Sequence, residues 1–417
     1  MKGYIWRSMF GPWVAVLVLV VEVAYALTDG APWRGDLVWT AGFEQATLVL
    51  SAPLLAAAVA VDTARLLSAG QAHLALDHRA RHRTIWLAIL AGTVPVAVVH
   101  LLVASGTWIV SMSSGHDFSV SLGTAVQPFV QIAILYFFAC LGSLVGRFAP
   151  AIVAGVVAAV MTLVVILGAA NADHGWVTML SIAGSQAPML GQEFASAYAV
   201  RQMAALLVSG TVIALVPLER RGRARVPTPW LAPLGVLVVL LLAYVPPSGP
   251  ATHRLAAASA EPTDCAGSSV TICTYKEHSR LRGDTVDAIE LLVTAAQREG
   301  YDAFVPARVV EVPNTSTDPV RLGRGELTWS FDSYDSFRGL PLALDQVASA
   351  LLTPRQCPQL YGDQPPTEAY WNDLNSLMVT WVSLAGAESQ YAMLDGVHAF
   401  STSDTAVAME RLQTCAF

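Results

Sequence analysis

Long runs of apolar residues alternate with short polar connections from the start of the chain to about residue 249. A helix that crosses a bilayer needs about 20 predominantly apolar residues. Seven runs satisfy this requirement and predict seven membrane spans: Pro12–Leu27, Gln45–Leu67, Thr84–Ser105, Val126–Gly146, Pro150–Ala170, Tyr198–Leu218 and Trp230–Val245. We therefore expect an α-helical polytopic membrane domain, a six-helix bundle followed by a seventh span.

The pattern changes after the proline-rich stretch VPPSGP. Short alternating or β-branched segments then predict strands, and segments with helical periodicity predict amphipathic helices. The expected strands are Ser269–Tyr275, Arg308–Val312 and Glu326–Phe331, and the expected helices are Asp284–Arg298, Leu342–Leu352, Thr367–Leu384 and Ser403–Thr414. The chain thus divides into a membrane domain (residues 1–249), a linker (250–260) and a C-terminal α+β domain (261–417).

The distribution of charge predicts how the chain lies in the membrane. Only 13% of the residues are charged, and the net charge is +3 up to Gly249 and −10 from Pro250, together the −7 of the whole chain. Eleven of the 13 basic residues before Pro250 precede the first span or lie between spans two and three, four and five, or six and seven. Basic loops stay in the cytoplasm. We therefore expect a multi-pass plasma-membrane protein with a cytoplasmic N-terminus and an extracellular C-terminal domain, whose acidity argues against nucleic acid as a partner.

Five polar residues lie inside the predicted spans, where an ionisable group is costly. One interpretation is a proton or ion path, but structural roles are favoured. Asp62 can pair with Arg65 on one helix face, Glu22 lies within two turns of the outer end, and a neutral His100 can bond a neighbouring helix. The remaining two, Gln127 and Gln131, are expected to join helices. The motif Gly142–Gly146 is a G-x-x-x-G, which indicates close helix packing.

Two connections between spans differ from ordinary loops. The basic segment Ala69–Thr84 predicts a short cytoplasmic helix on the membrane surface, anchored by its arginines next to anionic headgroups. The apolar but interrupted segment Asn171–Ala197 predicts interfacial or re-entrant helices at the outer face. The opening stretch MKGYIWRSMFGPW predicts a further interfacial helix at the inner face.

The positions of the cysteines favour disulfides over a metal-binding or catalytic role. Cys140 lies in span four, and the other four cysteines lie in the exported domain, where an even number predicts disulfides. We favour Cys265–Cys273, which a Gly-Ser turn can bring together, and Cys357–Cys415. A zinc site that adds His278 to the first pair matches no usual spacing. No hydrolase, zinc-protease or phosphate-loop motif is present, and the adjacent Glu277 and His278 leave a strand in different directions. The sequence predicts neither an enzyme nor a cofactor.

Taken together, the topology and one motif resemble type-2 ATP-binding-cassette transporter permeases, and more narrowly actinobacterial permease-like proteins with an extracytoplasmic domain. In that family the outer domain carries a C-x-x-P-E-H-like run. Here the run reads Cys273-Thr-Tyr-Lys-Glu277-His278, with Lys276 where proline is usual.

The resemblance implies an export permease subunit that works with a cytoplasmic ATP-binding-cassette ATPase and a second copy or second permease. It also implies that the segment between spans two and three docks on the ATPase, through Leu74, Asp77, His78, Arg79, Arg81 and Arg83. The alternative is a non-transporting membrane protein whose outer domain binds a ligand or partner protein, as in sensing or immunity.

Overall fold

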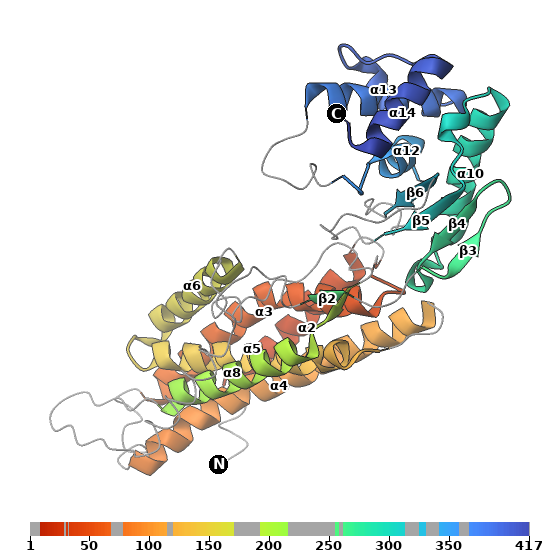
Figure 1. Ribbon diagram of the computed structural model, residues 1–417. Helices are drawn as coiled ribbons and strands as arrows, with labels where there is room; N and C mark the ends of the chain where they lie inside the picture. Colours follow the sequence, from red (N-terminus) through yellow and green to blue (C-terminus); the bar gives the residue numbers. More distant parts are fainter. Residues whose placement is uncertain are drawn as a thin grey trace.

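The computed structural model describes residues 9–28, 31, 33–67, 78–114, 120–170, 192–215, 255–257, 262–312, 325–330, 342–357 and 367–416. Its first part is a bundle of helices and its second part is a smaller α+β domain at one end of that bundle (Figure 1). The seventh predicted span, Trp230–Val245, lies outside the described residues, as do most of Asn171–Ala197 and the first eight residues.

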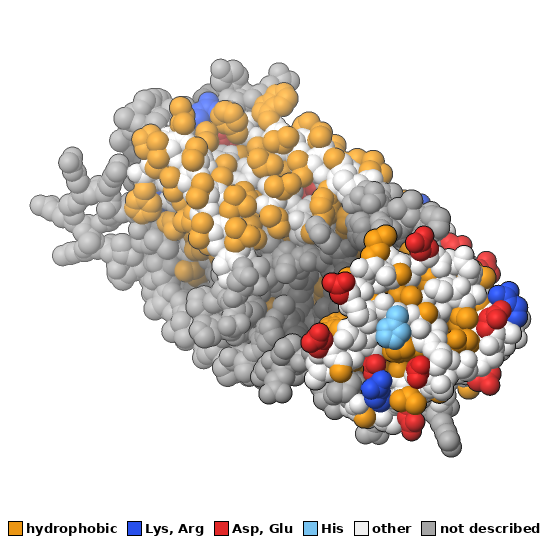
Figure 2. All heavy atoms as spheres, turned by 90° about the horizontal axis from the view of Figure 1, so that it is seen from above, with side chains coloured by type: hydrophobic (Ala, Val, Ile, Leu, Met, Phe, Trp, Pro, Cys, Tyr) orange, Lys and Arg blue, Asp and Glu red, His pale blue; other side chains and the backbone are white. Residues whose placement is uncertain are grey.

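Five helices among the described residues are long and apolar enough to cross a membrane. They are α3 (Leu37–Leu66), α4 (His78–Ser114), α5 (Leu122–Gly146), α6 (Ala151–Ala170) and α8 (Ser196–Leu215). A shorter apolar helix of 17 residues, α2 (Gly11–Leu27), precedes them. Their number and composition identify a multi-pass membrane protein. Apolar side chains crowd the visible face of the bundle, whereas acidic side chains are spread over the C-terminal domain (Figure 2).

Helix α5 packs against α3, α4, α6 and α8. Its approach to α3 is closest at the two glycines of the G-x-x-x-G motif. A Cβ atom on Gly142 would lie 2.2 Å from the carbonyl oxygen of Ala56, and one on Gly146 would lie 2.3 Å from that of Ala60. Only glycine permits this contact, so the expected role of the motif in close helix packing is confirmed.

Two helices begin earlier than the apolar pattern predicts. Helix α3 starts at Leu37, where the Asp36 side chain accepts a hydrogen bond from Trp39 N (2.9 Å) and caps the helix. Helix α4 starts at His78 and continues for 37 residues. The expected separate surface helix over Ala69–Thr84 is therefore wrong from His78 onward, because these residues form the first turns of α4. Residues 68–77 lie outside the described part.

The C-terminal domain contains a four-stranded sheet in the order β3-β4-β5-β6. The strands are β3 (Asp264–Ala266), β4 (Thr271–Thr274), β5 (Arg308–Glu311) and β6 (Glu326–Trp329). The first pair is antiparallel and the other two pairs are parallel. The parallel pairing of β4 with β5 requires a crossover connection, and the helix α10 (Arg282–Arg298) provides it.

Three further helices complete this domain: α12 (Leu344–Leu352), α13 (Glu368–Leu384) and α14 (Thr402–Thr414). Trp381 on α13 is fully buried, stacks on Phe304 at a ring distance of 4.7 Å and donates a hydrogen bond to Leu292 O on α10. Strand β3 was not expected; the other strands and the four helices match the expected ones within a few residues, and the α+β prediction for this region agrees with the structure.

The two parts of the molecule are in contact. A buried apolar cluster includes Trp33 and Phe43 at the ends of α2 and α3 together with Leu281 and Trp381 of the C-terminal domain. Burial lowers the pKa of Arg280 below its usual value, and the nearby charge of Arg34, in the connection between α2 and α3, lowers it further. The C-terminal domain therefore rests on the ends of α2 and α3.

A two-stranded ribbon marks the same end of the bundle. Strand β1 (Gln192–Phe194), directly before α8, pairs antiparallel with β2 (Leu255–Ala257), shortly before the C-terminal domain. The Phe194 carbonyl lies against Gly123 at the start of α5. The far end of α8 lies elsewhere, because Ala214 O accepts a hydrogen bond from Arg147 just beyond the other end of α5 (2.8 Å).

Candidate functional site

Three of the five intramembrane polar residues come together inside the bundle. The Nδ1 atom of His100 on α4 lies 3.0 Å from Glu22 Oε1 on α2, and its Nε2 atom lies 2.8 Å from Gln131 Oε1 on α5. The side chains are almost completely buried, with at most 2% of each exposed. Glu22 lies within two turns of the end of α2, as expected from the sequence, but it is buried there and is the partner of His100.

The hydrogen bonds fix where the protons lie. The amide nitrogen of Gln131 donates to Ala41 O on α3 (2.9 Å), which can only accept, so Gln131 Oε1 must face His100. His100 therefore carries a proton on Nε2. A single further proton joins His100 Nδ1 to Glu22 Oε1, either as an ion pair or as a neutral pair.

A second carboxylate lies nearby. Glu44 on α3 is 5% exposed and bonds Thr107 on α4 through Oε1. Glu22, Glu44 and His100 line one small cavity, together with Thr107 and aromatic side chains at its rim, Tyr25, Trp33 and Phe43. Within the described residues, Glu22 Oε2 and Glu44 Oε2 have no hydrogen-bond partner. We call Glu22, Glu44, His100, Thr107 and Gln131 the buried polar cluster.

The other two intramembrane residues have local roles. The Asp62 carboxylate accepts hydrogen bonds from Phe10 N (2.9 Å) and Gly11 N (3.1 Å), so it caps the start of α2. The expected partner was Arg65, whose guanidinium lies 5.3 Å from the centre of the Phe10 ring. Gln127 donates to Gly123 O of its own helix (3.4 Å), so this hydrogen bond does not join two helices as expected.

The expected docking residues are only partly described. Leu74 and Asp77 lie outside the described residues. His78, Arg79 and Arg81 belong to the first turn of α4, but their side chains are not described, and Arg83 is exposed on the same helix. The start of α4 lies at the end of the bundle that is remote from the C-terminal domain (Figure 1).

Both expected disulfides are present in the C-terminal domain. Cys265 and Cys273 stand opposite each other on the antiparallel pair β3-β4 and are bonded, and Cys357 is bonded to Cys415. Cys140 is a buried free thiol. The turn between the first two cysteines depends on Gly267, which has a positive φ of 112°. Because the thiols of Cys265 and Cys273 are joined, the alternative zinc site is ruled out.

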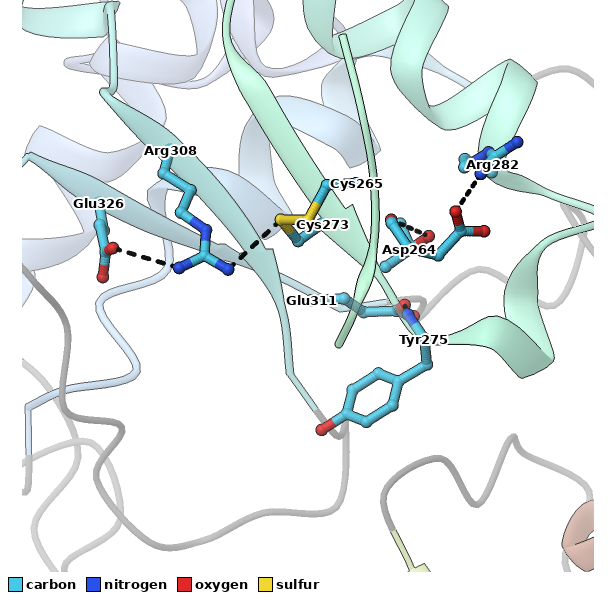
Figure 3. The surroundings of a disulfide bond; sticks show 9 residues. Asp264, Cys265, Cys273, Tyr275, Arg282, Arg308, Glu311 and Glu326 are labelled. Carbon is cyan, nitrogen blue, oxygen red and sulfur yellow. Dashed lines mark hydrogen bonds and ion pairs between the residues drawn. A yellow bond between two sulfur atoms is a disulfide. The ribbon is translucent and has the colours of Figure 1, made fainter. Parts of the chain in front are cut away.

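His278 has a partner that sequence reasoning missed. Its Nδ1 atom lies 2.5 Å from Glu311 Oε1 at the end of β5, and Tyr275 N donates to Glu311 Oε2 (2.7 Å). The latter contact lies beside the disulfide (Figure 3). The side chains of His278 and Glu311 are each 1% exposed or less. The Glu-His motif therefore braces the turn after β4 against β5, and the side chain of Glu277 is not described.

Sequence reasoning also missed Glu44 and Thr107. A usable signal exists, because Glu44, Thr47 and Ser51 are spaced three and four residues apart and so share one face of a helix. Ser51 does belong to this site, as its hydroxyl donates to Glu22 Oε1 (3.2 Å). The predicted span began at Gln45, one residue too late to include the carboxylate.

Comparisons with protein-family models, with curated proteins and with solved structures found no match to this chain. Among the described residues, no group of three or more histidine, cysteine or acidic side chains is arranged to hold a metal ion. The function is therefore argued from the geometry of the chain itself.

Proposed function

We propose that this protein is the membrane-spanning, permease-like subunit of an export system that a separate cytoplasmic ATPase drives. The observation that carries the proposal is the continuity of α4. At 1.5 Å per residue its 37 residues extend for about 55 Å, well beyond the roughly 30 Å of a hydrocarbon core. The basic residues between His78 and Arg83 form its first turns, where they are placed to meet a soluble partner.

This continuity would let a docked ATPase act on the interior of the bundle. A displacement at its first turns would reach His100 and Thr107 along the same helix, in which Pro95 removes one backbone hydrogen bond. The predicted resemblance to type-2 permeases assigns ATPase docking to this same connection between spans two and three. Geometry and resemblance thus support one role for the segment.

The basic end of the bundle would face the cytoplasm. Arg65, Arg83 and Arg147 all lie at the ends of helices remote from the C-terminal domain, and cytoplasmic ends are enriched in arginine and lysine. The C-terminal domain would then lie outside the cell, in agreement with its two disulfides, which persist in oxidising compartments.

The test is purification of the full-length protein from its native membranes in mild detergent, followed by measurement of ATP hydrolysis. We expect a stoichiometric ATPase subunit and nucleotide hydrolysis that the triple variant R79E/R81E/R83E loses by tenfold or more. Arg298→Glu is the matched control, since its side chain is 70% exposed on the C-terminal domain. Absence of an ATPase, or equal hydrolysis by the triple variant, would instead favour a non-transporting protein that acts through its outer domain.

A further inference from the structure

We infer that Glu22, His100 and Glu44 form a proton-binding site inside the membrane domain, in which Glu44 is the group that gains and loses the proton. The inference does not depend on a docked ATPase.

The Glu22–His100 pair holds its proton firmly. Since Gln131 fixes the proton on His100 Nε2, one proton between Nδ1 and Glu22 Oε1 satisfies both atoms. Removal of this proton would place two lone pairs 3.0 Å apart. The pair is neutral overall with its proton, whether the charges are separated or not.

Glu44 has a partner that suits both of its protonation states. Thr107 Oγ1 lies within bonding distance of Glu44 Oε1 and also 2.9 Å from Ala104 O of its own helix. When Glu44 is ionised, the Thr107 hydroxyl can donate to it. When Glu44 is protonated, it can donate to Thr107, whose own proton then goes to Ala104 O. Such a hydroxyl supports proton gain and loss without rearrangement of the helices.

The surroundings favour the protonated state while the cavity is closed. The groups that face Glu44 are Glu22 and Tyr25 from α2, His100 and Thr107 from α4, and Trp33 from the connection before α3. With a neutral Glu22–His100 pair, none of these supplies an unbalanced positive charge. A buried carboxylate without a counter-charge is costly, so Glu44 is expected to carry a proton.

The two unpartnered oxygens give the cavity its acceptors. Glu22 Oε2 and Glu44 Oε2 are both buried, both without a hydrogen bond within the described residues, and both belong to side chains that line the cavity. A water molecule or a hydronium ion in this space would find two acceptors there. Tyr25 and Trp33 also line the cavity, and both contact the apolar cluster that joins the bundle to the C-terminal domain.

The test is infrared spectroscopy of the full-length protein in lipid nanodiscs across a pH titration. A protonated buried carboxyl gives a carboxylic-acid C=O band that ionised carboxylates lack. At neutral pH we expect a Glu44 band that disappears reversibly as pH rises and is lost in Glu44→Gln, whereas a band from Glu22, present only if its pair with His100 is neutral, should remain in that variant. Thr107→Val should shift the band, because Glu44 then lacks its hydroxyl partner.

Asp62→Asn is the matched control for this experiment. Asp62 is equally buried in the same domain, but its oxygens accept backbone N–H groups, so it should be ionised and its replacement should leave the band unchanged. Two results overturn the inference: a wild-type spectrum in which no carboxylic-acid band is lost as pH rises, or a titrating band that survives in Glu44→Gln. If Glu44→Gln fails to fold, the shift of the titrating band in Thr107→Val decides the question.

Discussion

At the scale of single residues, the structure separates two histidines that look alike in the sequence. His100 and His278 are each buried and each bonded to a glutamate. His278 ends a short 3-10 helix (Lys276–His278) in the C-terminal domain, where Tyr275 N also bonds its partner, Glu311. His100 instead borders a cavity with a second carboxylate. The first arrangement holds a fold together, and the second provides a place for exchangeable protons.

The brace at His278 leads to a stability prediction. Truncation of one partner leaves the other buried and unpaired, which costs about 3–5 kcal/mol for a buried ion pair. We expect His278→Ala and Glu311→Ala each to lower the free energy of unfolding of the C-terminal domain by about this amount, as measured by pulse proteolysis of the full-length protein in urea.

Glu299→Ala is the control for the brace. Its side chain is 48% exposed in a surface pair with Arg298, and such pairs contribute about 0–1 kcal/mol. If the His278 and Glu311 variants are no less stable than Glu299→Ala, the brace is not needed for the fold of the domain.

At the scale of helices, apolar runs located the membrane segments but misplaced their ends. Helix α3 begins at Leu37 because Asp36 caps it, and the largely apolar residues from Leu37 to Phe43 belong to it, although the predicted span began only after Glu44. The buried polar cluster was harder to predict for a different reason. Each helix shows its own polar positions, but which faces meet depends on the packing of α2, α3, α4 and α5 together.

The approach of α5 to α3 provides a test at this scale. In Gly142→Ala and Gly146→Ala the new methyl group would overlap a backbone carbonyl of α3, so the helices must move apart. We expect the melting temperature of the full-length protein in nanodiscs to fall by several degrees. Gly106→Ala on α4 and Gly168→Ala on α6 are matched controls, because nothing lies within 4 Å of a Cβ atom there. Equal melting temperatures in all four variants would contradict the packing role.

At the scale of the whole molecule, two disulfides brace the C-terminal domain over very different lengths of chain. The first joins residues eight positions apart and the second joins residues 58 apart. In the chain-entropy account a disulfide stabilises the fold more when it closes a longer loop. The stabilisation is about 4 kcal/mol for the second bond and about 2.5 kcal/mol for the first. The second bond also fixes the end of α14 to the segment after α12.

We therefore expect C357A/C415A to lower the stability of the C-terminal domain more than C265A/C273A. Urea-dependent proteolysis of the full-length protein measures the difference, and Cys140→Ala serves as the control, because it removes a free thiol and leaves both disulfides intact. The reverse order of stabilities would show that loop length does not govern these bonds.

The small ribbon of β1 and β2 has a consequence for the path of the chain. It holds Leu255 at the end of the bundle where α8 begins, whereas Leu215 ends α8 beside Arg147 at the opposite end. The two ends of the intervening stretch therefore lie at opposite ends of the bundle. A helical crossing takes about 20 residues, only about half of that stretch. The number of residues is thus sufficient for one more passage, and a ribbon of three residue pairs holds the chain that leads into the C-terminal domain at the end of the bundle where α8 begins.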